Sequence, residues 1–148
     1  MDDFKNINLI VANFAMECVE SAMTNASIHS GKYKTLVKKM STLIQQNGLI
    51  GTLVFNLSKI SKTYHKEVLK NIIMWNVKNS KINNMNNFDT KQMIFTKTDN
   101  EKNDIKVFTD YIEWVTSLEP VEYRLLTKEM INLFAWIKRF ADGMIEGE

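Results

Sequence analysis

The sequence predicts an all-α protein, a single compact bundle of about five to six helices with no sheet. Its 148 residues include one proline and five glycines, which are too few turn-forming residues for a many-stranded fold. Apolar side chains also recur at steps of three and four along most of the chain, which is the spacing of one helix face. A chain of this length fits one domain, and we expect residues 1–148 to form it.

The composition is that of an ordinary globular protein, with 45% apolar and 24% charged residues. Cys18 is the only cysteine, which excludes an intramolecular disulfide and a zinc site built from cysteines. No apolar run approaches the roughly 18 residues that a membrane span requires, and the first residues do not form a secretion signal. We therefore expect a cytoplasmic protein with no membrane partner.

The N-terminal half divides into helices at two breaks. Apolar spacing over residues 7–23 predicts a first helix, which we expect to end before the Ser30-Gly31 pair. The same spacing over residues 33–44 predicts a second helix. Asn47 and Gly48 should stop this helix, because Asn and Gly most readily take the left-handed conformation that closes a helix.

Beyond that corner, one apolar stripe predicts a third helix that continues unbroken as far as residue 75: Leu53, Leu57, Ile60, Tyr64, Val68 and Trp75. Gly51 lies in the first turns of this helix. A glycine inside a helix costs about 1 kcal/mol relative to alanine. We therefore expect Gly51 to permit the close approach of a neighbouring helix.

The second half contains a polar connection and two more helices. Residues 79–103 are rich in asparagine, which favours turns, and should form a long irregular connection. Helical spacing resumes at Asp104 and is interrupted at Glu119-Pro120. The last helix should begin at Pro120 or at Thr127. Its predicted buried stripe is Leu126, Met130, Leu133, Phe134, Ile137, Phe140 and Met144.

No catalytic or metal-binding pattern is visible. His29 and His65 lie in different segments, without the spacing that would bring two metal ligands together on a helix. Gly48 and Gly51 lack the Lys-Ser/Thr pair of a phosphate-binding loop. No Ser-His-Asp or Cys-His arrangement can be assigned from spacing. We therefore expect a protein that is not an enzyme, with no catalytic residue, no metal and no cofactor.

The charge is concentrated in the middle of the chain. Residues 32–81 hold ten lysines and one acidic residue, whereas the segments on both sides are net acidic. Four of these lysines form a row: Lys59, Lys62, Lys66 and Lys70. Their spacing of three and four places them on one side of the predicted third helix, opposite its apolar stripe. Such a row suits an anionic partner, although solvated lysines on a helix exterior are the alternative.

Two sequence blocks, within residues 45–59 and 122–144, carry a resemblance to a known family: NGLIGTLVFNLSK and EYRLLTKEMINLFAWIKRFADGM. In their order and residues they resemble the small all-helical subunit of type III-B CRISPR RNA-guided effector complexes, the Cmr group. Neither block is a catalytic signature, and the Asn-rich stretch matches nothing in that family.

The resemblance implies a non-catalytic subunit of an antiviral defence complex. Several copies would stack head to tail into a filament beside the backbone subunits that hold the guide RNA, and the two filaments would form the target-RNA channel. The implied partners are the backbone and large subunits, neighbouring copies of the chain, guide RNA and target RNA. Lys138 and Arg139 would be the RNA-binding residues of the second block, together with the lysine row.

Two other classes of protein remain open from the residues alone. One is a stand-alone helical regulator that binds nucleic acid, although the long Asn-rich connection is atypical of that class. The other is a helical adaptor that binds only protein. RNA binding by the isolated chain would separate these two classes, and co-purification with CRISPR subunits would favour the effector complex.

Overall fold

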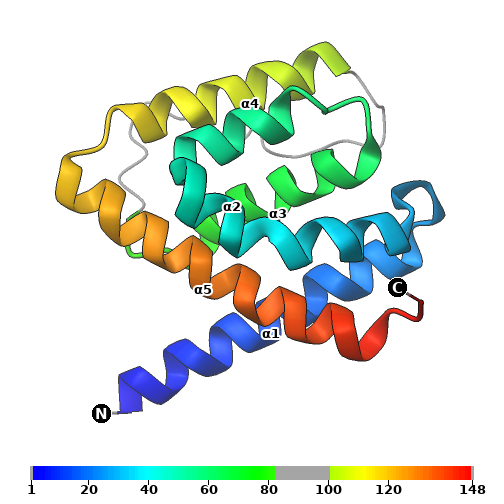
Figure 1. The fold of residues 1–148 in the computed structure, drawn as a ribbon. Coiled ribbons are helices and arrows are strands. Elements are labelled where there is room, and N and C mark those ends of the chain that lie inside the picture. Colours follow the sequence, from blue (N-terminus) through cyan, green and yellow to red (C-terminus); the bar gives the residue numbers. More distant parts are fainter. Residues whose placement is uncertain (1, 83–100, 148) are drawn as a thin grey trace.

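Figure 1 shows the fold of the computed structural model, which describes residues 2–82 and 101–147. These residues contain no strand, which confirms the predicted all-α class. They form five α-helices and one short 3₁₀ helix: α1 (Asp2–Thr24), η1 (Ala26–Ile28), α2 (Ser30–Leu57), α3 (Thr63–Lys78), α4 (Glu101–Thr116) and α5 (Pro120–Met144).

Helix α5 connects the two sides of the bundle, because it packs against both α1 and α2. Helix α2 in turn packs against α3 and α4, so most of the interior lies around α2 and α5. The N-terminal half of α1 extends past α5 (Figure 1), which leaves Ile7, Leu9 and Ile10 exposed. The predicted apolar stripe of the first helix is therefore buried only between Val11 and Ala22, and Met23 at its end is exposed.

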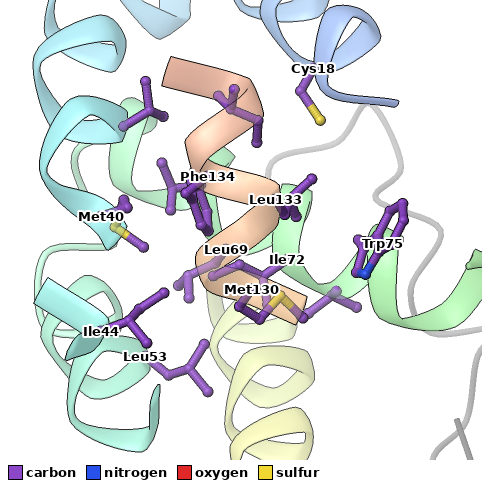
Figure 2. Close-up of a cluster of buried hydrophobic side chains, with 14 of the residues drawn as sticks. Cys18, Met40, Ile44, Leu53, Leu69, Ile72, Trp75, Met130, Leu133 and Phe134 are labelled. Carbon is purple, nitrogen blue, oxygen red and sulfur yellow. The ribbon is translucent and has the colours of Figure 1, made fainter. Parts of the chain in front are cut away.

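The core is built from apolar side chains of all five α-helices. Figure 2 shows Met40, Ile44 and Leu53 of α2, each at most 1% exposed, gathered with side chains of α3 and α5. Most of the predicted stripe of the last helix is buried, namely Leu126, Met130, Leu133, Phe134 and Ile137. Phe140 and Met144, at the end of the stripe, are half-buried. Removing this apolar surface from water is the main stabilising contribution to the fold.

The predicted break at Asn47-Gly48 is confirmed. Gly48 has φ 78° and ψ 163°, a conformation that side-chain-bearing residues rarely adopt, and it divides α2 into two parts. A helix break leaves backbone N–H groups without helical acceptors. The N–H of Ile50 donates instead to the hydroxyl of Tyr123 on α5, at 3.1 Å.

The chain doubles back at this corner. The side-chain amide of Asn56 contacts the sulfur of Met40 at 3.7 Å, although the two residues are 16 positions apart. In a straight helix that separation would be about 24 Å. The second part of α2 therefore returns along its first part.

The prediction of a third helix that continues unbroken as far as residue 75 is wrong. Helix α2 ends at Leu57, residues 58–62 form a turn, and α3 begins at Thr63. Asn56 fixes this reversal, because its amide donates to the carbonyl of Thr52 at 2.9 Å while its oxygen bonds Nδ1 of His65 at 2.8 Å. The apolar spacing continued through the turn because Ile60 and Tyr64 still pack against the core.

The role expected for Gly51 is also wrong. Gly51 is exposed, and the nearest atom to an added Cβ would be that of Asn47, at 3.5 Å in the preceding turn. No neighbouring helix among the described residues approaches it.

The later helices begin close to the predicted positions. Helix α4 starts at Glu101 rather than Asp104, and the remaining part of the predicted connection over residues 79–103 lies mostly outside the described residues. Helix α5 starts at Pro120, the first of the two predicted positions. Glu119 and Glu122 form a reciprocal capping box there, in which the N–H of Glu119 donates to Glu122 at 3.2 Å.

Buried asparagines of α3 hold it between α2 and α4, a feature that the apolar spacing did not predict. The hydroxyl of Tyr33 on α2 donates to Asn71 at 2.6 Å, and that of Tyr111 on α4 donates to Asn76. The amide of Asn76 then donates to the carbonyl of Ile82 at 2.6 Å. Because buried polar groups are costly when unpaired, these bonds fix how the three helices pack.

Replacing Gly48 and Gly51 by alanine should have opposite effects on stability. Gly48→Ala forces a residue with a Cβ into a backbone region that is essentially restricted to glycine, and should destabilise the fold by about 1–3 kcal/mol. Gly51→Ala adds a helix-favouring residue at an exposed site and should stabilise by about 0.4–1 kcal/mol. Chemical denaturation measures both. Destabilisation by both variants, or by neither, would contradict this account of the corner.

Leu53→Ala should cost about 2–5 kcal/mol, because it truncates a side chain that is fully buried in the core. The matched control is its neighbour Val54, which is 49% exposed, whereas Leu53 is 0% exposed. Val54→Ala should change the free energy of unfolding by less than about 0.5 kcal/mol. Similar denaturation midpoints for the two variants would show that Leu53 does not face the core.

Candidate nucleic-acid interface

The structure separates the four lysines of the predicted row. Lys59 and Lys62 lie in the turn between α2 and α3, whereas Lys66 and Lys70 lie on α3. The prediction that one helix presents all four on one side is therefore wrong, because the chain turns at residues 58–62. The turn changes which other basic residues lie near each pair.

Lys66 and Lys70 are engaged by carboxylates. Nζ of Lys66 lies 2.5 Å from Oδ2 of Asp104 on α4, and the two side chains are only 19% and 13% exposed. Nζ of Lys70 lies 3.8 Å from Glu67 on the same helix. Burial raises the pKa of Glu67, and Lys70 opposes that shift. These two lysines thus balance partly buried acids within the bundle.

Lys59 and Lys62 instead meet two lysines from the start of α2, Lys32 and Lys39, around one groove of about 430 Å³. We refer to this groove, with its four lysines and the side chains of Phe55, Tyr64 and His65, as the basic groove. None of the four lysines has an ion-pair partner among the residues that the structure describes. Four uncompensated positive charges around one concave surface concentrate a field that attracts anions.

Aromatic rings stand beside these charges. Nζ of Lys59 lies 5.8 Å from the ring centre of Phe55, and Nζ of Lys32 lies at the same distance from that of Tyr64. Both rings contact His65, with centroid separations of 5.6 Å for Phe55 and 4.9 Å for Tyr64. Each lysine is thus held weakly by a cation–π contact and is not neutralised by it.

His65 is a structural residue of the groove. It is buried, and its Nδ1–H donates to Asn56. Burial, with a further contribution from Lys59 and Lys62, lowers the pKa of His65 from 6.5 to about 4. The ring is therefore neutral near pH 7, and the positive charge of the groove comes from the lysines.

The other predicted basic residues, Lys138 and Arg139, lie elsewhere. Both are exposed on α5 and neither lines the basic groove. The guanidinium of Arg139 sits 4.8 Å from the ring centre of Trp136, which in turn stacks on Phe140 at 6.3 Å. Lys138 and Arg139 thus belong to a second basic and aromatic surface.

Spacing within the sequence did not reveal Lys32, Lys39, Phe55 or Tyr64 as members of one site. Lys32 and Lys39 are seven residues apart on α2, which places them on one helix face. Only the corner at Gly48 brings that face to Phe55 and Lys59. The predicted corner at Gly48, taken together with the seven-residue spacing of Lys32 and Lys39, is the sequence signal that could have revealed the site.

Other chemistry finds little support in the described part of the chain. It contains no group of three or more His, Cys, Asp or Glu side chains that could hold a metal ion. Cys18 is buried, and burial raises the pKa of its thiol, which disfavours the reactive thiolate. No helix in residues 2–82 or 101–147 is both long and apolar enough to cross a membrane.

The fold and the groove define a small all-α protein with a concave surface suited to an anionic partner. The family model described as CRISPR-associated protein (Cas_Cmr5) matches residues 8–144. The chain therefore belongs to this family, the small subunit of the type III-B Cmr complex, which confirms the resemblance carried by the two sequence blocks. The family is a structural small subunit and not a known catalytic family.

The two blocks meet in the structure. The first contains the corner at Gly48, and the second contains Tyr123, whose hydroxyl accepts the hydrogen bond from Ile50. The second block also supplies the buried α5 stripe, and Leu49 and Leu53 of the first block are buried in the same core. The residues that carry the family resemblance thus include part of the contact between α2 and α5.

The lowered pKa of His65 predicts a loss of stability in acid. Between pH 6.5 and about 4 the unfolded chain binds a proton at His65 that the folded chain does not, so this contribution is complete above pH 6.5 and falls as the pH decreases. The stability of His65→Gln should therefore fall less than that of the wild type between pH 7 and pH 4. Urea denaturation at several pH values measures this difference. Parallel stability curves would show that His65 titrates normally.

Proposed function

We propose that several copies of this subunit stack head to tail into a filament that lines the target-RNA channel of the type III-B complex. The basic groove supports the proposal, since a channel for RNA requires uncompensated positive charge along its wall. Guide and target RNA, the backbone and large subunits and neighbouring copies are the proposed partners. The setting is the cytoplasm and the role is antiviral defence, without catalysis by this chain.

Co-expression with the other subunits of the complex tests this proposal. The chain, carrying an affinity tag, should recover the backbone and large subunits together with guide RNA, in a stoichiometry above one copy per complex. A complex that assembles and binds target RNA equally well without this chain would contradict it. If the chain recovers protein partners but neither it nor its complex binds RNA through this chain, a protein-only adaptor would be favoured. If the chain binds RNA but recovers no partner subunit, a stand-alone regulator would be favoured.

The lysine variants must be chosen by their environment. Lys66→Glu would place a second carboxylate beside the largely buried Asp104, so it would weaken the α3–α4 contact as well as any RNA contact. Lys59 and Lys62 can be replaced without removing an ion pair within the described residues. These two lysines therefore give the cleaner test of RNA binding.

The double variant Lys59→Gln/Lys62→Gln should assemble normally and bind target RNA more weakly. Each phosphate contact to a single strand contributes a slope of about −0.7 in log affinity against log salt concentration, so losing two contacts should flatten the slope by about 1.4 per copy. The variant Lys78→Gln/Lys128→Gln removes the same charge outside the groove, without removing an ion pair within the described residues, and should leave the slope unchanged. If only Lys138→Gln/Arg139→Gln flattens the slope, the surface around Trp136 is the RNA contact.

A further inference from the structure

We propose that the basic groove binds unpaired ribonucleotides, with phosphates held by its lysines and a base stacked on Phe55 or Tyr64. The inference rests on the proposed function only for the identity of the polymer as RNA. It adds a mode of recognition: contact with bases as well as with the backbone, which selects single strands over duplexes without selecting sequence.

Phe55 carries the first part of this inference. Its ring is 38% exposed, although a phenylalanine is normally buried, and it lies among the lysines of the groove. A single exposed apolar residue is common on protein surfaces, but Phe55 lines the same groove as four lysines. A ring in that position can take a base on its face while Lys59 holds the adjoining phosphate.

Tyr64 provides a second ring in the lining of the groove. It comes from α3, whereas Phe55 comes from α2, and both rest on the buried ring of His65. Stacking of bases on aromatic side chains tolerates any sequence, because every base has a π face. The combination of ring platforms and a cationic groove is that of proteins that bind single strands.

Hydrogen bonds tie together the segments that hold these rings. The bond between Asn56 and His65 is buried, and Thr63 donates to the carbonyl of Ser27 at 2.5 Å, which ties the start of α3 to the segment before α2. A groove of about 430 Å³ lies within the size range of sites for small ligands. A preformed site of this kind can receive a nucleotide whose base is already unpaired, whereas a duplex would first have to open.

The experiment compares two anions on the isolated chain at low salt: a fluorescent oligouridine and an inorganic polyphosphate of the same charge. Phe55→Leu and Tyr64→Leu keep an apolar side chain but remove the ring, and each should weaken oligouridine binding by about 5- to 150-fold. Polyphosphate binding should stay unchanged in both variants. Lys59→Gln/Lys62→Gln should weaken the binding of both oligouridine and polyphosphate.

Three controls make the comparison specific. Tyr64→Phe keeps the ring and should restore most of the oligouridine affinity, whereas Val54→Ala lies next to Phe55 outside the groove lining and should match the wild type. A duplex of the same length should bind more weakly than the single strand. Circular dichroism and thermal melting check that each variant folds. If Tyr64→Leu does not fold, the result for Phe55→Leu alone decides whether a ring is required.

Two results would overturn the inference: wild-type oligouridine affinity in the folded ring variants, or an equal loss of oligouridine and polyphosphate in them. Absence of binding by the isolated wild-type chain would also overturn it. Failure of the proposed function is distinguishable, because it would appear as a chain that binds oligouridine with this pattern but does not join the effector complex.

Discussion

The reversal of α2 at Gly48 is the constraint on which the rest of the structure depends. The positive φ of Gly48 turns the chain, and the hydroxyl of Tyr123 satisfies the N–H of Ile50 that the break exposes. Because of this turn, Leu49 and Leu53 point into the core and Asn56 reaches Met40. The same turn carries Phe55 and Lys59 to the side of α2 that presents Lys32 and Lys39. One backbone conformation thus determines both the core and the candidate site.

Some polar side chains stabilise the packing of the helices, and others are available for binding. The buried asparagines of α2 and α3 form hydrogen bonds with Tyr33, Tyr111 and His65, and these bonds fix how α2, α3 and α4 pack together. Lys66 is matched by a partly buried carboxylate of α4, so its charge serves the packing of the bundle. The lysines of the basic groove have no such match among the residues described, and their charge is available to an outside partner. The strongly basic composition of residues 32–81 therefore combines two roles.

Periodicity in the sequence predicted most of the helices, since it reports which side chains are buried. The helical class and most of the α5 stripe follow from it directly. The break at Gly48 and the start of α5 at Pro120, one of two predicted positions, followed instead from the Asn-Gly and Glu-Pro pairs. It did not predict the turn at residues 58–62, because Ile60 and Tyr64 remain against the core on both sides of that turn. The basic groove could not be predicted from spacing along one helix, since Lys32 and Lys62 come together only through two successive reversals.

The most direct test of this account is a nuclear Overhauser contact between the ε-methyl group of Met40 and the side-chain amide of Asn56 in the isolated chain. The two groups lie in contact when α2 doubles back, with 3.7 Å between sulfur and nitrogen. A straight helix would hold them about 24 Å apart, far beyond the reach of such a contact. The account predicts a clear cross-peak, together with a gap in the helical backbone pattern at Gly48. An unbroken helical pattern through residues 46–51 with no contact between Met40 and Asn56 would contradict it.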